Sequence, residues 1–371
     1  MSGTVMMFGI GSLGGWVLEL LARSPGISTI ITCGRQEGSA SMKTECAAIG
    51  AGQEGYSKVI KFEKCDVNDI DSTAELIKRY NPDVIYSALA LLAWGDWNPI
   101  SHAIGAKFER ALACLMPTHA ALTSKLMKAM RKAGISAAVV NNSYPDCVNR
   151  VLCLNGLGPL VGAGNLDISV GEIRRKLSIL ESVPMRDVTI YLIAGHAIVS
   201  QGTRTGMPFF FKAMVGDKNI TDKHDIHALI SDSLFRATPA DKARWLNEPY
   251  IAASAVRNIK AIINDTNEFA HSPGPNGLPG GYPMRIGARG VEVVLPKEVT
   301  LEEAVKINLD GLKYDGVEEI KKDGTVVLTT EAYDTGEELY GLGLREYRFA
   351  DMEDIARELV ARVKRISAKY G

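Results

Sequence analysis

The chain has 371 residues, of which 46% are hydrophobic and 23% charged, a composition typical of a soluble globular protein with about two domains. Its net charge of −1 gives no electrostatic reason to expect binding to nucleic acid or to an anionic membrane. No apolar run reaches the ~18 residues of a membrane span, and the N-terminus is strand-like rather than a signal peptide. Six scattered cysteines without a C-x-x-C pair favour free thiols, a cytoplasmic location and no metal site.

The first predicted element is a strand over residues 4–10, which runs into the glycine-rich turn GIGSLG at 9–14 and then a helix over 13–23. This is the spacing of a dinucleotide-binding turn: Gly9 permits the tight turn, Gly11 lets the backbone approach a pyrophosphate, and Gly14 lets the helix pack close to the strand. The N-terminus of the helix offers free N–H groups to the phosphates. The residues expected at the cofactor here are Gly9, Gly11, Ser12, Leu13 and Gly14.

Strands and helices alternate through the rest of the first part. The pattern predicts strands at 28–33, 59–67, 83–90 and 136–142, and helices at 40–49, 71–80 and 108–133, the last broken near Pro117. Such alternation indicates an α/β fold with a doubly wound parallel sheet of Rossmann type. Ligands of these sheets bind at the carboxyl ends of the strands, which adds Ser87 to the expected cofactor residues.

The second part mixes helices and strands without this alternation, so we expect an α+β domain. It contains a charged helix near 170–181, a strand at 188–194, a Pro/Gly-rich loop at 271–282, and a helix that starts after Thr300 with Glu303 near the capping-box position. Further expected elements are helices at 225–234, 241–246, 251–263 and 351–369, strands at 284–288 and 290–295, and an Asp-Gly hairpin at 321–329. The predicted domains are 1–157, which binds the dinucleotide, and 158–371, which carries the substrate site and the oligomer interface.

The end of the second predicted strand favours NADP over NAD. NAD sites usually have a carboxylate there for the ribose 2′-hydroxyl, whereas NADP sites have an arginine for the 2′-phosphate. The strand ends in TCGR at Arg35, and the first carboxylate is Glu37. Arg35 can hold a phosphate through two hydrogen bonds. Asp66, after the third strand, is a candidate acceptor for the adenine amine or, alternatively, a helix cap. NADP is therefore the predicted cofactor, with NAD as the alternative.

Two residues of the second part suggest acid/base chemistry. Asp167 closes the sequence GNLD just before a predicted helix, and His196 follows the strand at 188–194. A histidine whose ring N–H is held by a carboxylate is a good proton donor and acceptor. Hydride transfer to a ketone needs such a donor beside the carbonyl oxygen.

Taken in order along the chain, these segments resemble the lactate/malate dehydrogenase superfamily. The match includes the glycine-rich turn, Asn142 after the fifth strand, VGAGNLD around Asp167, the strand leading to His196, and the segments at 250–265 and 280–295. The resemblance implies a second domain of lactate/malate dehydrogenase type and a homodimer or homotetramer. It also implies that His196 is the acid/base, that Asp167 is its partner, and that Asn142 lies near the nicotinamide and the substrate.

The chain departs from that family where the substrate carboxylate would bind. The family places an arginine three residues after the aspartate, and this chain has Val170 there. The nearby candidates for substrate binding are Glu172 and Arg174, and Arg110 has a spacing compatible with the family's mobile-loop arginine. Three apolar residues follow His196. Lactate and malate themselves are therefore not the expected substrates.

These observations predict an NAD(P)-dependent oxidoreductase that acts on a hydroxyl/ketone pair of a small molecule. One alternative is an imine- or amine-type, or saccharopine-like, reductase in which Glu172 holds a cationic group of the substrate. The other is a Rossmann protein that senses NADP(H) without catalysing a reaction.

Overall fold

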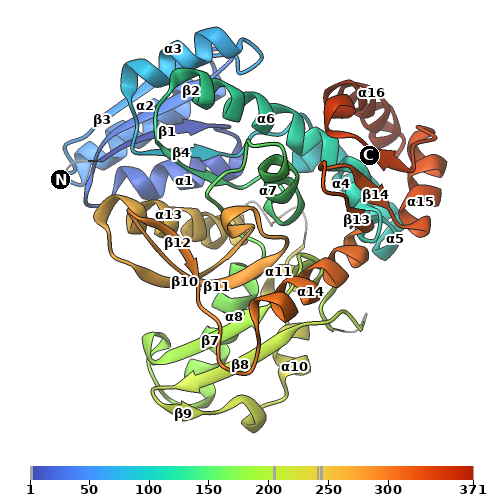
Figure 1. Cartoon of the computed structure of the whole chain (residues 1–371). Helices are drawn as coiled ribbons and strands as arrows, with labels where there is room; N and C mark the ends of the chain where they lie inside the picture. Colours follow the sequence, from blue (N-terminus) through green and yellow to red (C-terminus); the bar gives the residue numbers. More distant parts are fainter. Residues whose placement is uncertain (1–2, 204–205, 240–241, 243–244, 371) are drawn as a thin grey trace.

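The computed structural model describes residues 3–203, 206–239, 242 and 245–370. In this part of the chain the central feature is a six-stranded sheet with the strand order β3-β2-β1-β4-β5-β6 (Figure 1). Every neighbouring pair in it is parallel, so the predicted doubly wound sheet of Rossmann type is confirmed. Its strands are β1 (Gly3–Phe8), β2 (Ile27–Gly34), β3 (Val59–Lys64), β4 (Val84–Ser87), β5 (Ala138–Asn141) and β6 (Val161–Gly162).

Helices cover both faces of this sheet because its strands are apolar on both sides. On β1, Met6 and Phe8 belong to the core beneath α3 and α6, whereas Val5 and Met7 belong to the core beneath α1 and α13. A strand that alternates between two cores is the expected result of a parallel sheet buried on both faces. The helices packed on the sheet are α1 (Ser12–Ala22), α2 (Ser39–Gln53), α3 (Ile70–Tyr80), α6 (Met116–Ala133), α7 (Pro145–Leu154) and α13 (Glu248–Asn264).

The connection between β4 and β5 differs from the prediction of one long helix from residue 108. It contains α4 (Trp94–Ile104), α5 (Ala106–Glu109) and the short helix η1 (Leu112–Leu115), and α6 begins only at Met116. Pro117 thus lies in the first turn of α6, where a proline costs no hydrogen bond, instead of breaking a longer helix. The helix α4 was not predicted, and it places Pro99 within its first two turns.

The described residues of the second part form three antiparallel sheets: β7-β8-β9, β10-β11-β12 and, in the C-terminal segment, β13-β14-β15. The predicted loop at 271–282 is wrong in part, because residues 271–273 are paired in β10 with the strand β11. The predicted cap of α14 is confirmed: Thr300 and Glu303 bond each other's backbone N–H groups. The predicted helix 241–246 falls partly on residues 241, 243 and 244, which lie outside the described residues.

The strands are β7 (Val188–Ile193), β8 (Phe210–Val215), β9 (Lys218–Asn219), β10 (Glu268–Pro273), β11 (Gly281–Gly287) and β12 (Gly290–Val293). The helices are α8 (Leu166–Leu180), η2 (Met185–Asp187), α9 (Ala197–Gln201), η4 (Thr221–Lys223), α10 (Ile226–Ser231), α11 (Leu234–Ala237), η5 (Pro275–Gly277) and α14 (Leu301–Leu312).

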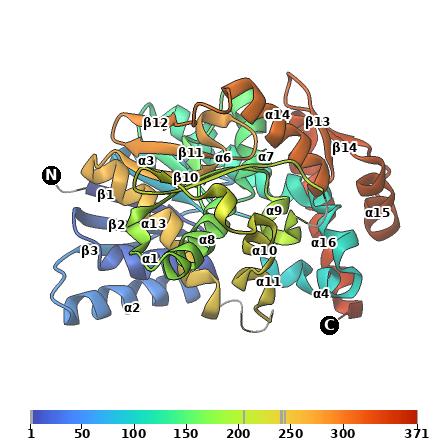
Figure 2. The same ribbon diagram turned by 90° about the horizontal axis from the view of Figure 1, so that it is seen from below.

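The C-terminal segment returns to the first sheet. Its helix α16 packs against α6 and α4, and Figures 1 and 2 both show it beside α4. Val326, Leu328 and Leu359 of this segment are buried in the same core as Met6 and Phe8. The predicted Asp-Gly hairpin is present as β13 and β14. The elements are η6 (Lys313–Asp315), β13 (Val317–Ile320), β14 (Val326–Leu328), α15 (Thr330–Tyr340), β15 (Glu346–Tyr347), η7 (Phe349–Asp351) and α16 (Met352–Tyr370).

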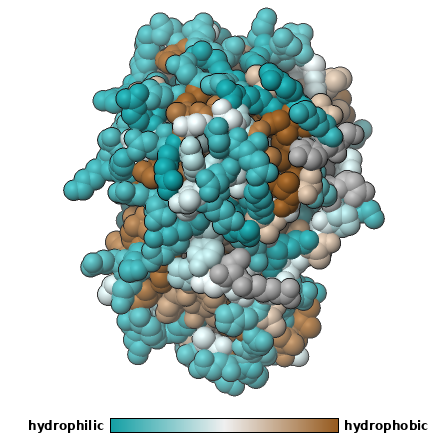
Figure 3. All heavy atoms as spheres, turned by 90° about the vertical axis from the view of Figure 1, so that its right-hand side faces the viewer, coloured by the Kyte–Doolittle hydropathy of each residue, from teal (hydrophilic) through white to brown (hydrophobic). Residues whose placement is uncertain are grey.

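The sheet does not end at the predicted domain boundary. The strand β6 follows residue 157 and still pairs with β5, and the division into 1–157 and 158–371 stays a prediction. On the face that carries α15 and α16, hydrophilic side chains predominate and apolar ones gather in small patches (Figure 3). Of the described helices, none has both the length and the apolar character needed to cross a membrane.

Candidate active site

The glycine-rich turn between β1 and α1 has the geometry that the sequence predicts. Gly9 has a φ of +91°, in the left-handed region that favours glycine. A Cβ on Gly14 would lie 2.1 Å from the carbonyl oxygen of Gly9, so only glycine lets α1 pack this close to β1. A Cβ on Gly11 would meet no atom within 4 Å, because this residue faces open space. Leu13 is half-buried and packs on the core beneath α1.

A cavity of about 1140 Å³ opens in front of this turn. The first turn of α1 has no side-chain cap, so its N–H groups are available to a phosphate placed there. Trp16 and Trp245 meet edge to face across the cavity wall, with ring centroids 6.3 Å apart. The cavity is lined by Ile10, Gly11, Ser12, Gly15, Trp16, Glu19, Gly34, Arg35, Gln36, Glu37, Ser39, Ala40, Lys43, Asp66 and Trp245.

Two side chains contact the glycine-rich turn directly. Ser12 donates a hydrogen bond to the carboxylate of Glu248 at 2.5 Å, so an anionic ligand at the start of α1 has to displace this carboxylate. Lys43 of α2 donates to the carbonyl oxygens of Ile10 and Gly11. Lys43 therefore places a positive charge on the cavity wall, and Glu248 places a carboxylate at the start of α1, both beside the position expected for the phosphates.

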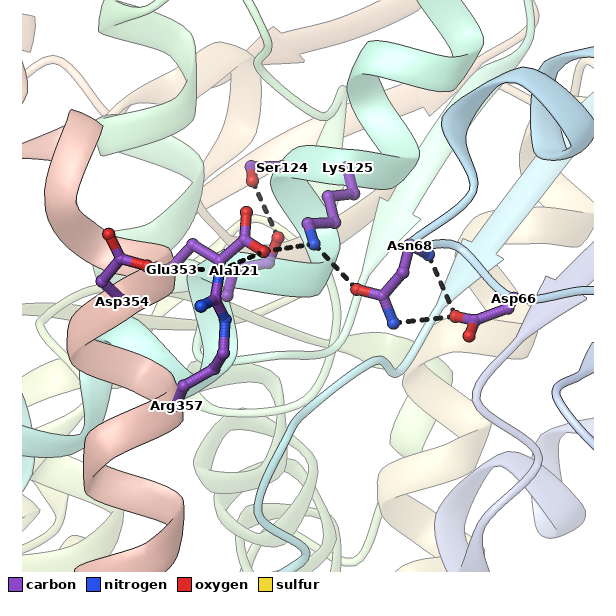
Figure 4. A network of polar contacts seen from close by, with 8 residues as sticks. All are labelled: Asp66, Asn68, Ala121, Ser124, Lys125, Glu353, Asp354 and Arg357. Atoms are coloured by element: carbon purple, nitrogen blue, oxygen red, sulfur yellow. Dashed lines mark hydrogen bonds and ion pairs between the residues drawn. The ribbon is translucent and has the colours of Figure 1, made fainter.

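Asp66 lies on the cavity wall, and it does not cap α3. Its Oδ1 accepts hydrogen bonds from the backbone and side-chain nitrogens of Asn68 at 3.0 and 2.8 Å, and the cap of α3 is Asp69. The network continues through Lys125 of α6, which bonds Asn68 at 2.8 Å and Glu353 of α16 at 2.5 Å (Figure 4). The cavity wall is thereby connected to the C-terminal helix.

His196 lies at the start of α9, directly after β7, and its Nδ1 is 2.9 Å from Oδ1 of Asp315. The predicted partner was Asp167, and that pairing is wrong in this structure. Asp167 instead accepts a hydrogen bond from Arg257 at 2.8 Å. Arg257 lies on helix α13 and forms an ion pair with Asp167. This carboxylate is therefore paired with a guanidinium and not with the histidine.

Two glycines let Asp315 reach His196. A Cβ on Gly195 would lie 3.3 Å from the carbonyl carbon of Gly311, and a Cβ on Gly311 would lie 3.3 Å from the nitrogen of Gly195. The end of α14 therefore packs backbone to backbone against the end of β7. Asp315 follows four residues later in η6 and is fully buried, which holds its carboxylate against the imidazole.

Carboxylates surround this pair. Burial is the largest single effect on His196 and opposes its charged form, but Asp315, Asp146 and Glu109 together raise its pKa from 6.5 to about 9. Burial raises the pKa of Asp146 from 3.8 to about 6, against the opposite pull of His196 and Asn165. Burial also raises the pKa of Glu109. At neutral pH the imidazole is therefore positively charged.

The ring of Tyr144 packs edge to face against His196. The ring centroid of Tyr144 lies 5.6 Å from that of His196 and 6.1 Å from that of His119. Tyr144 has a φ of +43°, a costly conformation for a side chain of this size. Burial lowers the pKa of His119 from 6.5 to about 4, which leaves it neutral. Tyr144 follows β5, so His196 lies beyond the carboxyl edge of the parallel sheet.

Asn142 and Ser87 meet at this same edge. The backbone nitrogen of Asn142 donates to the carbonyl oxygen of Ser87 at 2.7 Å. The side-chain oxygens Oδ1 of Asn142 and Oγ of Ser87 are buried and have no hydrogen-bond partner in the described structure. Ser87 does not line the cavity in front of the glycine-rich turn, whereas Arg35 does.

The three predicted substrate-binding side chains have structural partners instead. Arg110 pairs with Glu331 of α15 at 2.6 Å, and both side chains are partly exposed. Glu172 accepts hydrogen bonds from two backbone N–H groups at the start of α11 at 2.9 and 3.0 Å. Arg174 donates to two backbone carbonyls around the start of β7 at 2.9 and 3.1 Å. Each of these side chains therefore has a partner within the protein, and its role in substrate binding stays a prediction.

Sequence reasoning missed Asp315, Asp146, Glu109 and Tyr144. Glu109 ends α5 directly before Arg110; its carboxylate acts on His196 electrostatically, whereas Arg110 pairs with Glu331. Asp146 follows a proline at the start of α7, and its place beyond a strand end was a usable signal. Asp315 comes from a segment with no catalytic motif. Among the described residues no group of three or more His, Cys, Asp and Glu side chains is arranged to hold a metal ion.

No family model matches the sequence, and a search of curated proteins finds no significant match. Solved structures do match. The chain superimposes on the malate dehydrogenase of Picrophilus torridus with a TM-score of 0.59 and 19% identity, which covers 84% of this chain and 96% of that one. A lactate dehydrogenase from a Medee basin deep-sea metagenome library gives 0.59 at 15% identity, covering 84% and 96%. The lactate dehydrogenase of Eimeria maxima, solved with NADH and oxamate, gives 0.60 at 16% identity, covering 84% and 91%. The fold is thus that of the lactate and malate dehydrogenases, as predicted.

Proposed function

We propose that this protein is an NAD(P)-dependent oxidoreductase that interconverts a ketone and an alcohol on a small molecule. One arrangement carries the proposal: the glycine-rich turn with its large cavity and the His196–Asp315 pair lie at the same carboxyl edge of one parallel sheet. A dinucleotide on the turn extends along that edge toward the strand end that carries Asn142 and Tyr144. The fold shared with solved lactate and malate dehydrogenases supports the same reading.

Each residue then has a defined task. A bound reduced nicotinamide supplies the hydride. Asp315 engages Nδ1 of His196, so Nε2 is the ring nitrogen that meets the substrate oxygen. His196 gives its proton to that oxygen during reduction and takes it back during oxidation. Asp315 fixes the ring orientation and stabilises the imidazolium. Asn142 hydrogen-bonds the same oxygen through its side-chain amide.

The adenosine end of the cavity favours NADPH. Arg35 follows the end of β2 with no carboxylate at the strand end itself, and Ser39 lies beside it on the cavity wall. A guanidinium and a hydroxyl suit a 2′-phosphate. The Eimeria maxima protein was solved with NADH, so NADH is the competing cofactor. We expect a cytoplasmic homo-oligomer, in line with the sequence-based prediction.

The experiment is to follow NADPH and NADH oxidation with a panel of ketones and 2-oxo acids, in the wild type and in His196→Ala. Loss of the proton donor should lower kcat by about 10²–10⁴-fold while cofactor affinity stays within about threefold. His102→Ala, on an exposed position of α4, is the matched control and should keep full activity. Unchanged turnover in His196→Ala would remove the assigned role. Tight cofactor binding without turnover of any compound would favour a sensor of NADP(H).

A further inference from the structure

Three buried acceptor atoms in the region of His196 have no hydrogen-bond partner in the described structure. They are Oδ1 of Asp146, Oδ2 of Asp315 and Oδ1 of Asn142. Asp146 and Asp315 are both fully buried. A buried carboxylate oxygen without a partner is costly, and such atoms are usually satisfied by a ligand when they lie at a functional site. All three atoms accept hydrogen bonds, so a ligand that satisfies them must donate several hydrogen bonds.

The fixed charge of this region is negative. The side chains that act on His196 are the acidic cluster, defined as Glu109, Asp146 and Asp315. One imidazolium balances one of these carboxylates, and the neighbouring His119 is neutral. Negative charge on the fully buried Asp146 is unfavourable unless a cation accompanies it.

In the part of the chain that the structure describes, two arginines of this region have other carboxylate partners. Arg257 is paired with Asp167, and Arg110 is paired with Glu331 at a half-exposed position. Arg150 lies one turn after Asp146 on α7, yet the described side chains show no ion pair between the two. Among the described residues, no ion pair joins a guanidinium to Asp146 or Glu109, so a substrate carboxylate would meet carboxylates there.

We propose that the substrate carries a positively charged amino group close to its reacting carbonyl, and that Asp146, helped by Glu109, binds this group. The substrate class is then an amino ketone in reduction and the matching amino alcohol in oxidation. An ammonium has three N–H donors and a compact charge, which matches unpartnered carboxylate and amide oxygens. This inference rests on the proposed oxidoreductase function and specifies its substrate.

Three ketones with the same three-carbon skeleton test the proposal: 1-aminopropan-2-one is cationic, 1-hydroxypropan-2-one is neutral, and pyruvate is anionic. With saturating NADPH, we expect kcat/KM to be at least about tenfold higher for the cation than for the neutral compound, and lowest for pyruvate. In Asp146→Asn, the kcat/KM for the cationic ketone divided by that for the neutral ketone should fall close to one. Asp217→Asn, at an exposed position, removes one negative charge elsewhere and should leave the ratio unchanged. Glu109→Gln should also reduce the ratio and replaces Asp146→Asn if that variant does not fold.

A second readout separates the two proposals. Thermal unfolding with NADP⁺ is measured with 1-aminopropan-2-ol and with propane-1,2-diol, and the amino alcohol alone should raise the midpoint. If the neutral or anionic ketone is reduced as well as the cationic one, the substrate inference is wrong and the oxidoreductase proposal stands. If no ketone is reduced but the amino alcohol stabilises the protein, the cation site stands and the proposed activity fails. If no ketone is reduced and the amino alcohol does not stabilise the protein, both the oxidoreductase proposal and the substrate inference are overturned.

Discussion

At the scale of single residues, the proposed chemistry depends on which carboxylate pairs with His196. Asp167 forms an ion pair with Arg257, and the carboxylate of Asp315 lies 2.9 Å from Nδ1 of His196 instead. The acidic cluster then keeps the imidazole charged, with a pKa of about 9. A histidine that stays protonated through neutral pH is prepared to donate a proton, which suits the reduction of a carbonyl more than the oxidation of an alcohol.

Arg35 gives a residue-scale prediction about the cofactor. Arg35→Ala should weaken NADPH binding by roughly ten- to a hundredfold, because a charge-assisted contact with the 2′-phosphate is lost, and should leave NADH affinity within about threefold. Fluorescence titration of both cofactors measures this. Arg289→Ala, at an exposed turn, serves as the control. An equal loss of affinity for NADH and NADPH would mean that Arg35 does not bind the 2′-phosphate.

At the scale of elements, the sequence predicted what local patterns encode. The glycine spacing encoded the turn at Gly9 and Gly14, the apolar runs encoded the parallel strands, and Thr300 with Glu303 encoded a helix cap. The partner of His196 could not be predicted this way, since Asp315 lies 119 residues further along the chain. Its approach depends on Gly195 and Gly311 meeting in space, and no local pattern records such a contact.

Gly14 gives an element-scale prediction. In Gly14→Ala the new Cβ would lie 2.1 Å from the carbonyl oxygen of Gly9, so the start of α1 must move. We expect a loss of about 1–3 kcal/mol in the free energy of unfolding and a clear loss of cofactor affinity. Gly171→Ala in α8, where a Cβ would meet no atom within 4 Å, should be neutral or stabilising by up to about 1 kcal/mol. Urea unfolding and cofactor titration of both variants compare them. Similar behaviour of the two would show that close packing at Gly14 is not required.

At the scale of the whole molecule, the C-terminal segment belongs to both the core and the site. Its residues Val326, Leu328 and Leu359 complete the core on one face of the parallel sheet, and η6 at its start supplies Asp315. Lys125 and Glu353 connect α16 to the cavity wall. Stability and activity should therefore depend on the same packing.

The stability of the whole molecule should fall as the pH rises. His196 has a folded-state pKa of about 9 against an ordinary 6.5, so its contribution is complete below about pH 6.5 and is lost between pH 6.5 and 9. The raised pKa of Asp146, about 6 against 3.8, acts in the same direction between about pH 4 and 6. Urea unfolding of the wild type from pH 6.5 to 9 should show this decline, and His196→Gln should flatten it. If the free energy of unfolding of His196→Gln declines with pH as steeply as that of the wild type, the decline comes from groups other than His196.

The pH dependence of ketone reduction in the wild type and in Asp315→Asn tests the central claim, that Asp315 holds His196 as the proton donor. The wild type should keep its kcat/KM up to about pH 9, where His196 loses its proton. In Asp315→Asn the amide keeps a hydrogen-bonding oxygen but removes the charge, so the fall should move to lower pH and the plateau should drop. A profile of unchanged midpoint in Asp315→Asn would contradict the account.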